Sequence, residues 1–301
     1  MNEKTTGDNN WPESHAYKKT TGDNNWLQSY AYNKTSQHGE DGIIEKVLEV
    51  IGESDKWCVE FGSWDGKVAS NTYTLITDKD YSAVLIEASS KRFQDLKKTF
   101  GGNNKVVMLN QFVGFGSDDN LDEILKNTEI PVDFDLLSID IDGNDYHVWQ
   151  AVQNYKPKVV VIEFNLTIPK EVEFVQERDP AVTQGSSVLS LTKLARSKGY
   201  ELVATTKSNA IYVDEKYFDK FGITDNSVEK MWTYRPYISY IFCGYDGRIF
   251  IRGYGKSPSH LFRFKESKMQ ILPSWAIKRV GDKNFIRKKL GKFYRRLIKE
   301  K

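Results

Sequence analysis

The regular alternation of short apolar runs with segments of helical periodicity is the feature that most constrains this fold. Apolar runs of strand length recur between residues 57 and 164, and amphipathic segments separate them. This alternation is typical of a parallel sheet whose strands are connected by helices. The runs that we expect to form buried strands are 57–62, 82–87, 105–110, 134–140 and 158–164.

Two further segments complete the expected sheet. Residues 186–199 predict a capped helix that ends in glycine, and residues 200–213 predict a hairpin of two closing strands. We therefore expect an α/β fold, with a Rossmann-like, mostly parallel seven-stranded sheet, helices on both faces and a C-terminal hairpin. Residues 167–185 have a loop-like composition and are long enough to act as a lid.

Composition divides the chain into four segments. Residues 1–33 are polar and contain a tandem repeat, in which "KTTGDNNWPESHAYK" returns as "KTTGDNNWLQSYAYN". We interpret the repeat as a local duplication whose first copy is dispensable. Residues 34–215 carry the strand and helix pattern and form the expected main domain. An aromatic-rich extension, 216–260, follows, and 261–301 form a basic tail.

The composition argues against membrane-spanning and secreted proteins. No segment stays apolar over the ~20 residues that a spanning helix needs, and the polar N-terminus lacks the apolar region of a secretory signal. Two cysteines, Cys58 and Cys243, are too few for a disulfide framework. Both lie among apolar residues, so we expect each to be a small buried hydrophobe. These observations favour a cytoplasmic protein.

The basic tail has a charge opposite to that of the rest of the chain. Residues 261–301 contain 14 Lys or Arg and three acids, whereas acids exceed bases before them. Within 285–301, apolar residues recur at helical spacing at Ile286, Leu290, Phe293 and Leu297. The pattern predicts a basic amphipathic helix that either lies on the anionic inner surface of the membrane or docks on the acidic body. Nucleic acid is a weaker alternative, because no RNA- or DNA-binding motif accompanies the charges.

The first predicted strand ends in a glycine turn, Glu60-x-Gly62-x-x-x-Gly66. A dinucleotide site requires G-x-G-x-x-G, and Trp64 stands where its central glycine should be. S-adenosylmethionine has no phosphate, so one tight glycine turn suffices, and an acid there can meet the ammonium of its methionine moiety. We therefore take Glu60, Gly62, Ser63 and Gly66 as candidate cofactor residues. The alternative is a glycine turn that closes any strand–helix unit.

Glu87 closes the second predicted strand, 25 residues after Gly62. A carboxylate at this position can accept hydrogen bonds from the two hydroxyl groups of a ribose, as acids do in nucleoside-binding α/β folds. The alternative is an acid that the dipole of the following helix favours. The spacing favours the ribose role.

A cluster of acids follows the fourth predicted strand, in "LLSIDIDGNDYHVW". Asp140 ends the strand and should lie at the rim of the cofactor cleft. Asp142 begins the turn that leads to the next helix, and Asp145 can cap that helix. His147 lies in the helix, where it is either a catalytic group or a polar residue without a chemical role.

Two parts of the sequence resemble a known family. "LDEILKNTEIPVDFDLLSIDIDGNDYHVWQAV", followed by "VVVIEFN", looks like the second half of the FkbM-like methyltransferases. "SQHGEDGIIE" and "VEFGSWDGKVASNTYTL" look like the opening of a related bacterial subgroup. The resemblance covers about residues 34–213. It implies a class I methyltransferase fold, S-adenosylmethionine as the cofactor, and Glu60, Gly62, Gly66 and Glu87 as its binding residues.

The resemblance also implies a reaction, because many members of the family modify sugars and polysaccharides. We expect O-methylation of a sugar or glycan-precursor hydroxyl, assisted by a general base. Our candidates are Asp142 first and His147 second, with Glu163 opposite, and Asp140 borders the cofactor. This sequence departs from the family at Asp142, where the family usually has glutamate.

Three alternatives stay open at this point. The family pattern does not require Mg²⁺, and we do not favour it; if a metal is used, the ligands would be Asp140, Asp142, Glu163 and Asn165. An Asp-x-Asp pair, Asp140 and Asp142, could instead hold a cation on the nucleotide sugar of a glycosyltransferase. The third alternative is a non-catalytic protein that binds membranes or nucleic acid through its tail.

Overall fold

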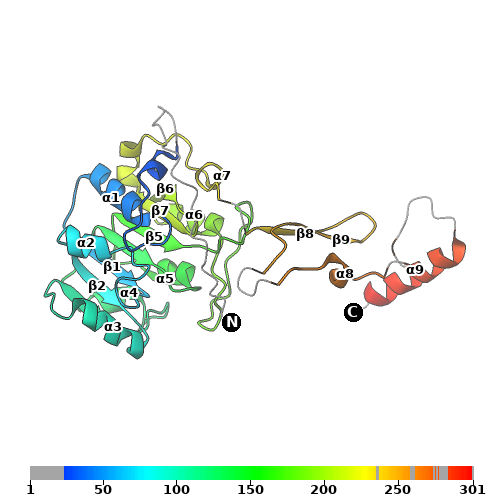
Figure 1. Ribbon diagram of the computed structural model, residues 1–301, viewed down its shortest axis with the longest axis horizontal. Coiled ribbons are helices and arrows are strands. Elements are labelled where there is room, and N and C mark those ends of the chain that lie inside the picture. Colours follow the sequence, from blue (N-terminus) through cyan, green and yellow to red (C-terminus); the bar gives the residue numbers. More distant parts are fainter. Residues whose placement is uncertain are drawn as a thin grey trace, which may run out of the picture. The chain divides into compact units, whose positions relative to one another are not determined.

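The computed structural model describes residues 24–234, 237–257, 262–273, 275, 277 and 284–299 (Figure 1). The first copy of the tandem repeat lies outside the described residues. The chain forms two compact units. The first unit extends to Asn165 and resumes over Lys170–Tyr234, and the second consists of Leu166–Pro169 and the residues that follow Tyr234.

In the first unit, seven strands of the described residues form one sheet with the order β3-β2-β1-β4-β5-β7-β6. The pairs among β1 to β5 are parallel, and β7 runs antiparallel to both β5 and β6. This arrangement confirms the predicted mostly parallel sheet with a closing hairpin. The strands are β1 (Trp57–Phe61), β2 (Ser82–Ile86), β3 (Val106–Leu109), β4 (Leu136–Ile139), β5 (Val159–Glu163), β6 (Tyr200–Thr205) and β7 (Asn209–Asp214).

Three of the helices that connect the strands begin at polar side chains that cap them. The side chains of Ser89, Asn120 and Ser187 each accept a hydrogen bond from a backbone N–H of the first turn that follows. Helices pack against the sheet, as Figure 1 shows. They are α1 (Glu40–Ile51), α2 (Tyr73–Asp78), α3 (Ser90–Phe100), α4 (Leu121–Leu125), α5 (Asp145–Ala151), α6 (Val188–Ser197) and α7 (Val228–Met231).

The core lies in the central strands, which are buried on both faces. All four residues of β4 are buried, and so are the first four of β5, Val159 to Ile162. Such continuous apolar runs are expected of parallel strands that helices cover. The polar ends of the strands therefore provide the side chains that reach solvent-accessible space.

A buried ion pair fixes the amino ends of β4 and β5. Lys158 Nζ lies 2.8 Å from a carboxylate oxygen of Asp135, which is fully buried, and 3.0 Å from Asp55. Burial alone would raise the pKa of Asp135, but hydrogen bonds from Lys158 and Ser54 outweigh it and hold that pKa below its usual value. The pair lies at the sheet edge opposite to the one where we expect the site.

The second copy of the repeat packs on the segment that follows β7. Trp26, in the 3₁₀ helix η1 (Trp26–Tyr30), is buried, and its Nε1 donates to the carbonyl of Phe221, 3.0 Å away. The side-chain oxygen of Asn24 accepts from the backbone N–H of Thr224 at 2.9 Å. The extension that we expected to begin at residue 216 therefore divides, since η2 (Glu215–Phe221) and α7 belong to the first unit.

The second unit contains a hairpin and two helices among its described residues. They are β8 (Ser239–Cys243), β9 (Ile249–Gly253), α8 (Glu266–Met269) and α9 (Phe285–Lys299). The expectation that both cysteines are buried holds for Cys58 and is wrong for Cys243, which is exposed at the end of β8. Cys243 belongs to a two-stranded hairpin, and its β8 neighbours Ile241 and Phe242 are exposed as well. No described helix is both long and apolar enough to cross a membrane.

The repeat offers a matched pair of tryptophans for a stability test. Trp26→Ala should lower the free energy of unfolding by about 3–5 kcal/mol, because it empties a buried indole site. Trp11 has the same place in the first copy. We expect Trp11→Ala, and deletion of residues 4–18, to leave urea unfolding nearly unchanged. A comparable loss in Trp11→Ala would contradict the view that the first copy is dispensable.

Candidate functional site

The candidate site lies where the strand order reverses, between β1 and β4. From β1 the order runs to β2 and β3 on one side, while β4 and β5 lie on the other. The loops that leave β1 and β4 therefore diverge at the carboxyl ends of these strands, which is where α/β sheets bind ligands. Two candidate acids, Glu60 and Asp140, lie at these ends, and Glu163 ends the neighbouring strand β5.

Gly62 allows the loop after β1 to pass the end of β4. Its φ is +75°, and a Cβ at this position would lie 2.1 Å from the carbonyl oxygen of Asp140. Any side chain would collide with backbone there, so the glycine is required by packing as well as by conformation. The two strand ends consequently come into direct contact, and the cavities described below open on either side of them.

Glu60 holds the loop that follows Gly62. Its carboxylate is buried and accepts hydrogen bonds from the Ser70 hydroxyl at 2.6 Å, the Asn71 backbone N–H at 2.8 Å and the Thr72 hydroxyl at 2.8 Å. Burial raises the pKa of Glu60, although these hydrogen bonds oppose the rise. Glu60 therefore positions the loop, and it also lines the first cavity.

Ser63 and Gly66 have packing roles in this loop. The Ser63 hydroxyl bonds to the carbonyls of Glu60 at 2.7 Å and Ile86 at 3.1 Å, which ties the ends of β1 and β2 together. Gly66 has a φ of +73°, and a Cβ there would lie 2.6 Å from Leu96 in α3. Ser63 also lines the first cavity, whereas Gly66 lines neither cavity.

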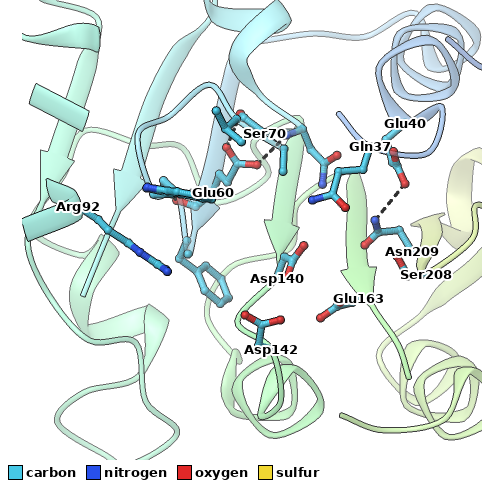
Figure 2. Close-up of a pocket in the computed structure, with 17 residues that line it drawn as sticks. Gln37, Glu40, Glu60, Ser70, Arg92, Asp140, Asp142, Glu163, Ser208 and Asn209 are labelled. Carbon is cyan, nitrogen blue, oxygen red and sulfur yellow. Dashed lines mark hydrogen bonds between the residues drawn. The ribbon is translucent and has the colours of Figure 1, made fainter. Parts of the chain in front are cut away.

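Two adjoining cavities open at the carboxyl edge of the sheet. The first has a volume of about 300 Å³ and is drawn in Figure 2, and the second has a volume of about 210 Å³. Phe61, Gly62, Arg92, Asp140 and Asp142 line both of them. A ligand with two ends can therefore extend past Gly62 from one cavity into the other.

Glu87 lines the second cavity together with apolar side chains. Its carboxylate accepts hydrogen bonds from the backbone N–H of Trp64 at 2.9 Å and of Ser89 at 2.7 Å. An ionised carboxylate has about four acceptor positions, so two remain for a ligand. The apolar wall of this cavity comes from Ile86, Phe112, Val113 and Val182.

Three carboxylates converge between the cavities. Oxygen atoms of Asp140, Asp142 and Glu163 all lie within 4.8 Å of one another, and Figure 2 shows them facing a common space. Burial raises the pKa of Asp140 to about 7, and the charges of Asp145 and Asp142 add to the rise. Burial, followed by the charge of Asp140, raises the pKa of Glu163 to about 10. A pKa raised this far favours the protonated form of Glu163 at neutral pH.

Asp142 is the exposed member of this group, and a neighbouring acid sets its backbone. Its φ is +57°, a left-handed conformation that is costly for a residue with a side chain. Asp145 accepts hydrogen bonds from the backbone N–H groups of Ile141 and Gly143, each at 2.9 Å. Asp145 thus holds the turn that presents Asp142. We expected Asp145 to cap α5, but the N-cap position is Asn144.

His147 and Asn165 do not line either cavity. His147 is buried, its ring contacts Phe115 and Tyr146, and its Nε2 bonds to the carbonyl of Gln176 at 2.9 Å. Through Gln176 it contacts the 167–185 segment and not the cavities. The Asn165 amide instead donates to the carbonyl of Gln184 at 2.6 Å.

The first cavity also contains polar side chains for which the sequence predicted no role. Glu40 accepts hydrogen bonds from the Thr206 hydroxyl at 2.6 Å and from the Asn209 amide at 3.1 Å. Figure 2 shows Gln37, Glu40 and Asn209 on the side of the cavity opposite Arg92. The available signals were a polar segment before α1 and the "KSN" turn between β6 and β7. Neither pattern is distinctive without the sheet that brings them together.

The raised pKa of Glu163 predicts a pH-dependent stability. Between the ordinary glutamate pKa and about 10, the folded chain binds a proton that the unfolded chain has lost, so stability falls as pH rises. Glu163→Gln is neutral at every pH and can still donate to Asp140. Its stability relative to the wild type should therefore rise from pH 5 to pH 8, by about 1.4 kcal/mol for each pH unit. Glu171→Gln, an exposed control, should show no such trend in urea unfolding, and equal curves for Glu163→Gln and the wild type would contradict the assignment.

The fold resembles solved structures at low sequence identity. The N-terminal domain of EvdMO1 with SAH bound is 11% identical with a TM-score of 0.41, over 60% of this chain and 82% of that chain. The CMeT domain of the citrinin polyketide synthase is 13% identical with a TM-score of 0.41, over 62% of this chain and 52% of that one. TrmK of M. capricolum in complex with S-adenosyl-homocysteine is 12% identical with a TM-score of 0.36, over 57% of this chain and 67% of that chain.

Sequence comparison identifies a family for one part of the chain. A search of curated proteins found no match. The model of the methyltransferase FkbM domain matches residues 117–202, from the segment before α4 into β6. This range includes Asp140, Asp142 and Glu163, the three converging carboxylates. The match confirms, over residues 117–202, the resemblance to the FkbM-like methyltransferases.

Proposed function

We propose that this protein is an S-adenosylmethionine-dependent O-methyltransferase whose acceptor is a hydroxyl group of a sugar or glycan precursor. The observation that carries the proposal is the acid-lined cavity at the diverging ends of β1 and β4. Five acidic side chains line the first cavity, and Arg92 is the one basic residue among its lining residues. The family match supports methyl transfer as the reaction class.

The charge of the cavities favours a cationic cofactor. S-adenosylmethionine carries a sulfonium and an ammonium group, and carboxylates of Glu60, Asp140 and Asp142 stabilise positive charge nearby. A dinucleotide or a nucleoside diphosphate carries phosphates, which the same carboxylates repel. Gly62 serves the close packing of the β1 and β4 ends, and Trp64 stands where a phosphate-binding loop would have its second glycine.

The second cavity suits the adenosine end of this cofactor. The two remaining acceptor positions of Glu87 match the paired hydroxyl groups of a ribose. The apolar side chains of Phe112, Val113 and Val182 provide surfaces for a flat adenine ring. Val182 belongs to the 167–185 loop, which Gln176 holds through hydrogen bonds to the N–H groups of Gln184 and Gly185. In this assignment the loop covers the cofactor and excludes water.

The first cavity suits a neutral acceptor with several hydroxyl groups. Its far side presents Gln37, Ser208 and Asn209, which can both donate and accept hydrogen bonds. The acidic lining disfavours acceptors that carry phosphate or carboxylate near the reacting oxygen. A sugar fits this cavity for two reasons. Its reacting hydroxyl is uncharged, so the acidic lining does not repel it, and its other hydroxyl groups can bond to the polar side chains.

The converging carboxylates can activate such a hydroxyl. Methyl transfer requires the acceptor oxygen, the methyl carbon and the sulfur to lie in line, and a general base removes the proton of the hydroxyl. Asp142 is our candidate base, because it is exposed to both cavities. The raised pKa of Glu163 favours its neutral form, which limits the repulsion that Asp142 experiences.

Binding measurements separate this function from its rivals. We expect S-adenosylmethionine and S-adenosylhomocysteine to raise the melting temperature of the full chain, and nucleoside diphosphate sugars to leave it unchanged. If a nucleotide sugar with Mg²⁺ stabilised the chain and neither S-adenosylmethionine nor S-adenosylhomocysteine did, the result would favour a glycosyltransferase that uses Asp140 and Asp142. Stabilisation by none of these ligands would favour a non-catalytic protein and overturn the proposal.

Glu87→Gln tests the cofactor assignment. The substitution should weaken S-adenosylmethionine binding by about 1.5–3 kcal/mol, because a charge-assisted hydrogen bond to the ribose becomes a neutral one. Calorimetry measures the affinity, and circular dichroism checks the fold, because Glu87 also holds Trp64 and Ser89. Asp95→Asn on the exposed face of α3 is the control. Unchanged affinity in Glu87→Gln would remove this residue from the site.

Asp142→Asn tests the general base. Turnover should fall by about 10²–10⁴-fold while cofactor affinity holds, because the variant keeps the shape of the turn but not the basic oxygen. Asp133→Asn, an exposed acid outside both cavities, should retain turnover. Full turnover in Asp142→Asn would reject it as the base. Loss of wild-type turnover in EDTA, restored by Mg²⁺, would assign the acids to a metal ion instead.

A further inference from the structure

The helix α9 combines an apolar stripe with a basic flank. Its sequence, "FIRKKLGKFYRRLIK", contains seven Lys or Arg and no acid. The four residues Ile286, Leu290, Phe293 and Leu297 lie within an arc of about 60° at 3.6 residues per turn. They are 70%, 53%, 62% and 50% exposed, respectively.

A different side of α9 contacts its own unit. Gly291 is buried, and the ring of Tyr294 meets that of Trp275 edge to face at a centroid distance of 5.3 Å. By helical phase these two positions lie on one flank of the stripe. The side chains of Lys289, Lys292 and Arg296 lie on the opposite flank and are exposed. The apolar stripe and the basic flank therefore face outward together.

We propose that α9 is a membrane-surface anchor, which lies on an anionic lipid bilayer with its apolar stripe in the interface and its basic flank among the headgroups. Charge complementarity favours this occupant, because seven cations without an acid match a surface of negative headgroups. A helix of 15 residues with this charge is too short and too polar to cross the bilayer, so it lies parallel to the surface.

The chemistry of α9 separates a bilayer from other polyanions. A nucleic acid would use the basic residues and leave Ile286, Leu290, Phe293 and Leu297 in water. A bilayer interface accommodates both the basic and the apolar side chains, since the apolar ones enter the acyl boundary while the lysine stems reach to the headgroups. On the basic flank, Lys289 Nζ lies 4.6 Å from the centroid of the Phe285 ring, so cationic and aromatic groups lie side by side there.

Cosedimentation of the full chain with lipid vesicles tests the proposal. We expect binding to phosphatidylcholine vesicles that contain phosphatidylglycerol, at least about tenfold stronger than to pure phosphatidylcholine, and weakened by salt. The double variant Lys289→Glu with Lys292→Glu should lose about tenfold or more of the anionic binding. Leu290→Ser with Phe293→Ser should lose binding as well, because the stripe no longer inserts.

A matched control and a stability measurement make the outcome decisive. Lys265→Glu with Lys268→Glu changes the same charge near α8 and should keep binding within about twofold, because its effect on α9 is screened. Equal loss in this control, equal binding to neutral vesicles, or no binding to anionic vesicles would overturn the proposal. A lower melting temperature in Leu290→Ser with Phe293→Ser, without vesicle binding by the wild type, would show that the stripe packs on protein. Binding of duplex DNA but not of vesicles would assign α9 to nucleic acid.

Discussion

The close approach of Gly62 to the carbonyl of Asp140 is the contact on which the candidate site depends. It joins the ends of β1 and β4, where the sheet order reverses, and leaves no room for a Cβ. Glu60 then fixes the loop after Gly62 through three hydrogen bonds, and Asp145 fixes the turn after Asp140 through two. Two buried carboxylates thus hold the two loops between which the cavities open. The same packing brings further acids together at high electrostatic cost.

That cost is visible in the converging carboxylates. Asp140 and Glu163 have raised pKa values because burial removes water and neighbouring charges repel. A sequence under selection for stability alone would replace one of them with a neutral residue, so such clusters mark functional sites. In the function that we propose, a cationic cofactor offsets this repulsion when it binds. The left-handed backbone of Asp142 is a second local cost in the same turn.

Much of the fold could be predicted because strands and helices leave local periodic signals. The five apolar runs, the closing hairpin and the capped helix within residues 186–199 all appear in the structure. Two local expectations were wrong. Cys243 is exposed, because apolar neighbours in sequence do not ensure a covering layer, and Asp145 bonds back to the preceding turn instead of capping α5. The division of the chain also differs, since η2 and α7 pack with the first unit.

The sequence by itself determined the order of strands along the chain, the acids at their carboxyl ends and the amphipathic pattern of α9. These properties depend on residues that are adjacent or one helical turn apart. Only the tertiary structure decided which polar residues meet. It joined Glu40 to Asn209 across the sheet, separated His147 from Asp142 although five positions apart in sequence, and turned Gly66 toward α3. The physical reason is that a cavity is formed by the ends of several strands, and their side-by-side order is set by packing between segments distant in sequence.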